Sequence, residues 1–129
     1  MTITFLFYLL MVKHAVCDFY LQGRLTGGGD ENKLLSKKKN RHALDHAIGT
    51  AVVFIILNFC TEASWLVIPL FAVMDYVLHL LIDWRKNIIT KHYGLKAQDR
   101  SYWKLTAIDQ CAHYSCYFLY CWLYIVYWL

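Results

Sequence analysis

The sequence has little of what marks a soluble or disulfide-stabilised domain. Charged residues make up only 17% of its 129 residues, and it contains one proline, Pro69. Its five cysteines are odd in number and form no CxxC pair, which argues against a disulfide framework and a cysteine-ligated metal. Hydrophobic residues account for 59% of the chain, and the mean hydropathy is +0.36. A single multi-pass domain of the inner (cytoplasmic) membrane, residues 1–129, is therefore expected.

Four long apolar segments predict membrane helices of about the length that a bilayer requires. They cover about residues 2–22, 42–59, 63–84 and 102–128. The connections 23–41 and 85–101 are rich in lysine and arginine, whereas the turn near residue 61 has neither. The positive-inside rule places both basic connections in the cytoplasm and both chain ends outside. The predicted fold is an all-α, integral membrane four-helix bundle, N-out and C-out, with Pro69 as a candidate kink.

Each predicted helix carries ionisable side chains four residues apart. The pairs are His14 and Asp18, His42 and His46, His79 and Asp83, and Asp109 and His113. This spacing puts both side chains on one helix face, which in a membrane should turn toward other helices. The order reverses in the last helix, which also runs in the opposite direction to the first and third. One histidine layer is therefore expected, with the carboxylates and His42 roughly 6 Å nearer the cytoplasm.

The convergence of these side chains predicts a metal centre in the cytoplasmic half of the membrane. Imidazole and carboxylate ligands suit zinc, manganese or iron. The expected ligands are His14, Asp18, His46, His79, Asp83, Asp109 and His113. Such a set would hold one or two divalent ions, or would leave some members to orient the imidazoles. Asp75, one turn before His79, belongs either to this site or to a protonated interhelical hydrogen bond.

Three ordered motifs in these segments resemble those of a known family. Residues 14–22 read HAVCDFYLQ, residues 79–86 read HLLIDWRK, and residues 109–113 read DQCAH. They resemble the H-x-x-x-D-F-x-L-Q, H-x-x-I-D-x-x-K and D-Q-x-x-H motifs of small bacterial and phage membrane proteins known as domain of unknown function 3307. His46 resembles the family's single histidine in the second helix. The resemblance implies the fold and the site but no reaction, and a looser similarity to small inner-membrane metal-dependent hydrolases implies hydrolysis.

The leading hypothesis is a metal-dependent hydrolase of a phosphoester or a lipid head group at the cytoplasmic membrane surface. The ion would activate a water molecule and stabilise the developing oxyanion. Asp18 or Asp109 would act as the general base, and Gln110 beside Asp109 is placed in the same catalytic set. Basic side chains near the opening would attract an anionic head group. They are Arg85, Lys86 and Lys104.

Two other classes of function stay open. The same side chains would also suit an ion or proton path, although the polar groups stop in the cytoplasmic half. In a non-enzymatic membrane interaction protein, the cluster would be a structural staple and the connection 23–41 would dock a partner. The formal charge of +4 is explained by topology, so nucleic-acid binding is not expected. The bilayer is the expected partner, and a homo-oligomer is left open.

Overall fold

The computed structural model describes residues 3–21, 34, 36–61 and 64–128. The described chain folds into four α-helices and one π-helical segment. They are α1 (Ile3–Ala15), η1 (Val16–Leu21), α2 (Lys37–Cys60), α3 (Val67–His92) and α4 (Arg100–Trp128). Strands are absent from the described ranges, so the all-α, four-helix prediction is confirmed.

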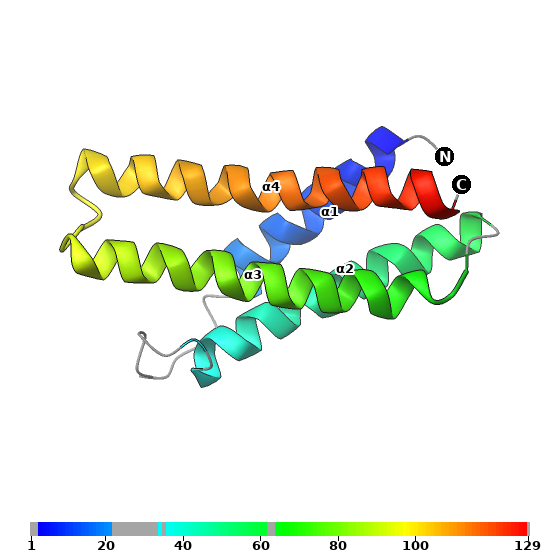
Figure 1. The fold of residues 1–129 in the computed structure, drawn as a ribbon, viewed down its shortest axis with the longest axis horizontal. Coiled ribbons are helices and arrows are strands. Elements are labelled where there is room, and N and C mark those ends of the chain that lie inside the picture. Colours follow the sequence, from blue (N-terminus) through cyan, green and yellow to red (C-terminus); the bar gives the residue numbers. More distant parts are fainter. Residues whose placement is uncertain (1–2, 22–33, 35, 62–63, 129) are drawn as a thin grey trace.

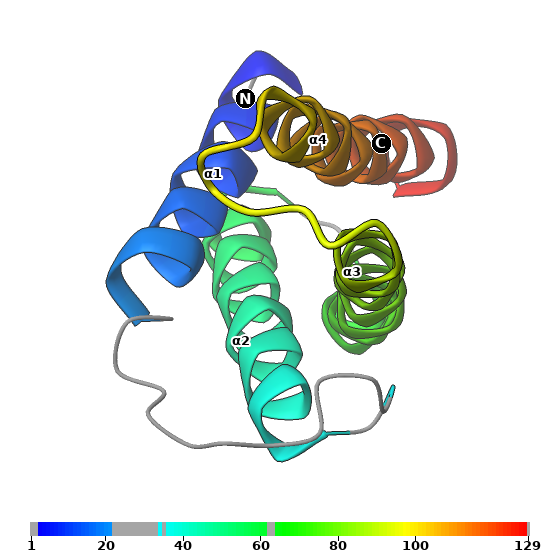
Figure 2. The ribbon, with the colours of Figure 1, turned by 90° about the vertical axis from the view of Figure 1, so that its left-hand side faces the viewer.

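The four helices alternate in direction, so α1 begins and α4 ends at the same end of the bundle (Figure 1). Viewed along the bundle, the helices form a ring in which each packs against two neighbours, α2 most extensively against α3 (Figure 2). At the end opposite the termini, α3 and α4 project beyond α1 and α2 (Figure 1). This alternation agrees with the predicted up-and-down topology.

The second helix begins at Lys37 rather than His42, inside the stretch predicted to be a loop. Ser36 is its N-cap residue, and the Ser36 hydroxyl accepts a hydrogen bond from the Lys39 backbone N–H at 3.5 Å. A serine in this position satisfies a backbone donor that the first helical turn leaves free. The basic run therefore belongs to α2. Residues 22–33 and 35 of the predicted connection lie outside the described residues.

The third helix continues to His92, well past the predicted end at Trp84. It stops at Gly94, which has a φ of 60° and donates its backbone N–H to the Lys91 carbonyl at 3.2 Å. Glycine adopts this left-handed conformation without strain, which suits it to the position just after a helix end. Pro69 lies in the first turn of α3, where proline removes no intrahelical hydrogen bond. The expected kink therefore has no cause there.

Three helical segments are long and apolar enough to cross a membrane: Ile3–Leu21, Lys37–Cys60 and Val67–His92. Within the described chain α4 is not among them, so length and composition support three of the four predicted spans. Large apolar side chains cover the outside of the bundle; Phe19 is 84% exposed and Phe59 78%. A surface of this kind suits lipid rather than water. Insertion, the inner-membrane location and the N-out/C-out orientation stay predictions.

The half of the bundle nearer the chain ends is packed with aromatic and aliphatic side chains. We call this group the aromatic core: Leu6, Leu10, Val53, Phe54, Leu57, Val67, Phe71, Tyr117, Tyr120, Cys121 and Tyr124. The rings of Phe54 and Phe71 stack with centroids 4.5 Å apart and planes 4° apart. This packing holds the four helices in register, and the ionisable side chains lie beyond it along the same helices.

Candidate metal centre

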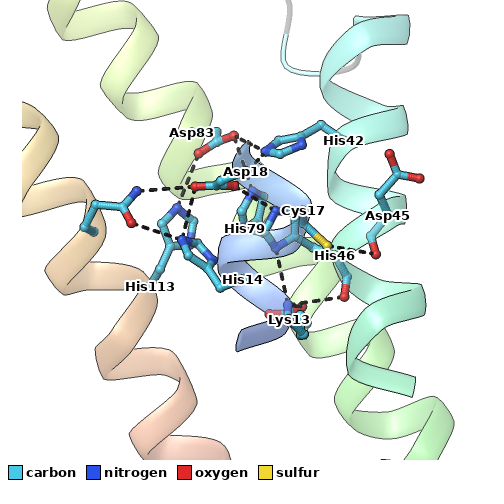
Figure 3. Close-up of polar contacts among 12 residues, drawn as sticks. Lys13, His14, Cys17, Asp18, His42, Asp45, His46, His79, Asp83 and His113 are labelled. Carbon is cyan, nitrogen blue, oxygen red and sulfur yellow. Dashed lines mark hydrogen bonds and ion pairs between the residues drawn. The ribbon is translucent and has the colours of Figure 1, made fainter. Parts of the chain in front are cut away.

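Five histidine side chains meet between the helices, beyond the aromatic core (Figure 3). They are His14 on α1, His42 and His46 on α2, His79 on α3 and His113 on α4, and each is at most 5% exposed. The His46 and His79 rings stack with centroids 3.6 Å apart, and the His79 and His113 centroids are 4.3 Å apart. We call these residues the histidine cluster.

All five imidazoles direct Nε2 toward two carboxylates. The Asp18 carboxylate lies 3.2 Å from His14, 3.3 Å from His42 and 3.0 Å from His46. The Asp83 carboxylate lies 3.4 Å from His79, 3.3 Å from His113 and 3.7 Å from His42. Nitrogen and oxygen atoms from every helix thus face one small volume, as in bundle proteins that bind metals through facing helices.

Three overlapping groups of these side chains could hold an ion. They are Asp18 with His42, His46 and His79; His14 with His79 and His113; and Asp83 with Asp109 and His113. Within each group, one ligand atom per residue lies within 4.8 Å of all the others. The seven residues predicted as metal ligands all fall in these groups. Whether they bind an ion stays a prediction.

His42 joins the site, although the sequence placed it at its edge. Its Nε2 contacts both Asp18 and Asp83, at 3.3 Å and 3.7 Å. The predicted layering already put His42 at the depth of these carboxylates, one turn outside His46. The signal that could have identified it is therefore the spacing of four residues between the two histidines of α2.

His79 is the side chain that most clearly needs a ligand. It is 2% exposed, and neither ring nitrogen has a hydrogen-bond partner. His42 Nδ1 and Asp109 Oδ1 are also buried without a partner. Each such atom costs about 1–3 kcal/mol when it is removed from water. A divalent cation would satisfy the nitrogen and oxygen lone pairs that point into the cluster, so the donor set fits zinc, manganese or iron.

Asp18 reaches the cluster from the π-helical segment η1 rather than from a regular α-helix. A π-helical turn is wider than an α-helical one, and such turns frequently occur at functional sites. Asp18 still contacts His14 four residues before it, as its spacing predicts, and also contacts His46 on α2. Helical periodicity in the sequence does not reveal this π-helical segment.

Gln110 links the parts of the site and was predicted to belong to it. Its Oε1 lies 3.1 Å from His14 Nε2, and its Nε2 lies 3.5 Å from Asp18 and 3.4 Å from Asp109. On the opposite side of the His14 ring, Nδ1 lies 2.8 Å from the Tyr117 hydroxyl. Contacts of this kind fix the orientation of a ligating imidazole. Tyr117 was not predicted, because it lies within an aromatic-rich stretch that suggests only packing.

Lys86 pairs with Asp109 at the edge of the cluster. Its Nζ donates a hydrogen bond to Asp109 Oδ2 at 2.8 Å, while Asp109 Oδ1 lies 3.9 Å from His113 Nε2. The sequence placed Lys86 in a loop that attracts substrate, but it belongs to α3 and is half-buried. Arg85 and Lys104, proposed for the same role, are exposed.

A buried ion pair between Lys13 and Asp75 lies beside the cluster and was also missed. Lys13 is 7% exposed; its Nζ lies 3.3 Å from His46 Nδ1 and donates to the His46 carbonyl at 3.2 Å. Asp75 also accepts hydrogen bonds from Thr50 at 2.7 Å and Tyr120 at 3.4 Å. Asp75 is thus the partner of a lysine rather than a metal ligand. The sequence does contain a signal for this ion pair, because Lys13 lies inside an apolar segment, where a charged side chain needs a partner.

Asp45 adjoins His46 in the sequence, but its carboxylate points away from the imidazoles (Figure 3). Gln22, one turn beyond Asp18 in the sequence, lies outside the described residues. The supporting side chains are therefore Gln110, Tyr117 and Lys13, from α4 and α1.

Comparison with curated proteins and with solved structures gives no match. The similarity to metal-dependent hydrolases therefore stays a prediction. The chain does match the family described as "Protein of unknown function (DUF3307)" over residues 6–128, a range that includes every member of the histidine cluster and all three carboxylates around it. The protein belongs to this family of unknown function.

Proposed function

We propose that this protein is a membrane-embedded, metal-dependent hydrolase of a phosphoester-like or lipid head-group substrate. One observation carries the proposal: five buried imidazoles direct Nε2 at two carboxylates, and His79 among them has no hydrogen-bond partner. Stability alone does not call for such a cluster, because interhelical hydrogen bonds contribute only about 0.6 kcal/mol each in membrane bundles. Ionisable side chains inside a membrane protein commonly mark function.

A bound divalent ion would activate water and stabilise the developing oxyanion. Asp109 suits the role of general base better than Asp18, because Asp109 Oδ1 is buried with no hydrogen-bond partner. Asp18, by contrast, is engaged by three imidazoles. Gln110 contacts both carboxylates and His14, so it acts as a positioning residue rather than as a catalytic one.

A groove between α3 and α4 supports a substrate with an apolar tail. It has a volume of about 270 Å³ and is lined by Leu81, Ile82, Arg85, Lys86, Ile89, Leu105, Ile108, Asp109 and Ala112. Asp109 belongs both to this groove and to the candidate metal centre. An acyl chain in the groove would bring an anionic head group to Arg85, Lys86 and the centre.

Metal content after purification in detergent without chelator tests the proposal. The variant combines His79→Ala with Asp83→Ala, and the control combines His92→Ala with Asp99→Ala, two exposed positions outside the cluster. We expect near-stoichiometric transition metal in the wild type and the control, and its loss in the cluster variant. Hydrolysis of an anionic phospholipid in mixed micelles, or of a nitrophenyl phosphodiester, should be measurable in the proteins that contain metal and absent from the cluster variant. A metal-free wild type would refute the proposal.

A proton relay is a second candidate, favoured by the contacts that continue inward from the cluster. They run from His46 through Lys13 and Asp75 to Tyr120, which belongs to the aromatic core. In liposomes with an internal pH dye, a relay predicts proton flux that Asp75→Asn removes without changing metal content. The hydrolase predicts no flux in either protein.

A further inference from the structure

We infer that the centre holds one divalent ion rather than two, because the Lys86 ammonium supplies the second positive charge. This inference rests on the proposed function and concerns the number and position of the ions. Asp109 belongs to one of the three candidate ligand groups, with Asp83 and His113. Its Oδ2 already accepts a hydrogen bond from Lys86 Nζ at 2.8 Å, and its side chain is 3% exposed. A cation therefore already occupies this carboxylate.

The charges of the site balance for a single ion. Asp18, Asp83 and Asp109 contribute three carboxylates, and Lys86 contributes one ammonium. Lys13 and Asp75 neutralise each other, and ligating imidazoles are neutral. Two negative charges remain, which one divalent cation cancels. A second divalent ion would leave two positive charges without a partner in a largely buried site, which is unfavourable.

The Lys86 ammonium also determines where the ion binds. Repulsion from the Lys86 ammonium disfavours a divalent cation at Asp109. The other two candidate groups, one built on Asp18 and one on His14, both include His79. His79 is the buried imidazole whose two nitrogens make no hydrogen bond, with Nε2 lying 3.4 Å from the Asp83 carboxylate. The ion therefore belongs at His79, in a ligand group that does not include Asp109.

Lys86 then has a function beyond charge balance. By holding Asp109 Oδ2, it keeps this carboxylate from ligating the ion and leaves Oδ1 available to accept a proton. In two-metal hydrolases, a second ion provides positive charge beside the leaving oxygen. Lys86 also lines the groove between α3 and α4, so its ammonium is available to a phosphate that enters there.

Titration of the metal-stripped full-length protein with Mn²⁺ tests the inference by elemental analysis and electron paramagnetic resonance. We expect one Mn²⁺ per wild-type chain, with the spectrum of an isolated ion. Lys86→Met removes the ammonium but keeps the length of the side chain. This variant should take up a second Mn²⁺ at Asp109 and give an exchange-coupled spectrum. Lys86→Arg, and the control Lys91→Met at an exposed position of α3, should stay at one.

The outcomes separate this inference from the proposed function. Two Mn²⁺ per wild-type chain, or one in a folded Lys86→Met at saturating Mn²⁺, would overturn the inference and leave the hydrolase proposal standing. No bound Mn²⁺ in the wild type would overturn both. If Lys86→Met does not fold, Asp109→Asn decides, because a one-ion centre keeps its single Mn²⁺ whereas a two-ion centre loses one.

Discussion

The same helices pack in two different ways along the bundle. In the aromatic core, the Phe54 and Phe71 rings stack at 4.5 Å among other apolar side chains. In the histidine cluster, the His46 and His79 rings stack at 3.6 Å, but both His79 nitrogens lack a hydrogen-bond partner. Burying apolar rings stabilises a fold, whereas burying unpaired polar atoms destabilises it. The aromatic half therefore stabilises the bundle. The residues of the polar half are not explained by stability.

The strongest way to break this division is to remove a ring from the aromatic core. Phe71 is fully buried and contacts Phe54, Tyr120 and Trp128. We expect Phe71→Ala to lower the free energy of unfolding by about 3–5 kcal/mol, because it leaves a cavity between stacked rings. Denaturant titration in detergent micelles measures the change. The control Val73→Ala changes a residue that is 62% exposed on the same helix and should have little effect. Equal losses in both would contradict the division.

The ion pair between Lys13 and Asp75 joins the two halves, since it contacts His46 on one side and Tyr120 on the other. Lys13→Met leaves the Asp75 carboxylate buried without a cation. We expect this change to lower the free energy of unfolding by about 3 kcal/mol, near the lower end for breaking a buried pair. The double variant Lys13→Met, Asp75→Leu should recover much of that loss. A double variant as unstable as the sum of its single variants would show that the two residues are not coupled.

Within the histidine cluster, a substitution is expected to raise the free energy of unfolding rather than lower it. His79→Leu replaces two buried nitrogens that make no hydrogen bond with apolar atoms of similar volume. The free energy of unfolding of the metal-free protein should rise by about 1–3 kcal/mol, because the penalty for those buried nitrogens disappears. Metal binding should be lost at the same time. His92→Leu, at an exposed position, is the control and should change neither quantity. A less stable metal-free variant would mean that His79 contributes to the fold.

The sequence predicted which side chains meet in the polar half better than it predicted where the helices begin and end. Spacing by four residues, combined with alternating helix direction, placed four histidines and three carboxylates at neighbouring depths, and the structure brings them together. That prediction succeeded because helical periodicity and topology alone determine which faces meet.

The buried Lys13 was missed because its burial depends on a contact between helices rather than on a pattern within one helix. Lys13 is buried because Asp75, far away in the sequence, neutralises it. Gly49 leaves room for the aliphatic part of the Lys13 side chain, since a Cβ at position 49 would lie 3.1 Å from Lys13 Cδ. The π-helical turn at Asp18 and the start of α2 at Lys37 likewise escaped prediction. A run of three lysines suggested a solvated loop, although the serine before it favours the start of a helix.

The smallest expected effect concerns that serine, which caps the polar end of α2. Ser36→Ala removes the acceptor of the Lys39 N–H and should cost about 1 kcal/mol. The loss should be local, because the cap lies two turns before the histidine cluster and far from the aromatic core. Hydrogen exchange should therefore quicken over residues 37–42 and stay unchanged over residues 53–57. The variant Ser36→Asp, which retains a capping oxygen, should restore the slow exchange. Faster exchange at both ends of α2 would show that the two halves unfold as one unit and that the division between them is chemical rather than energetic.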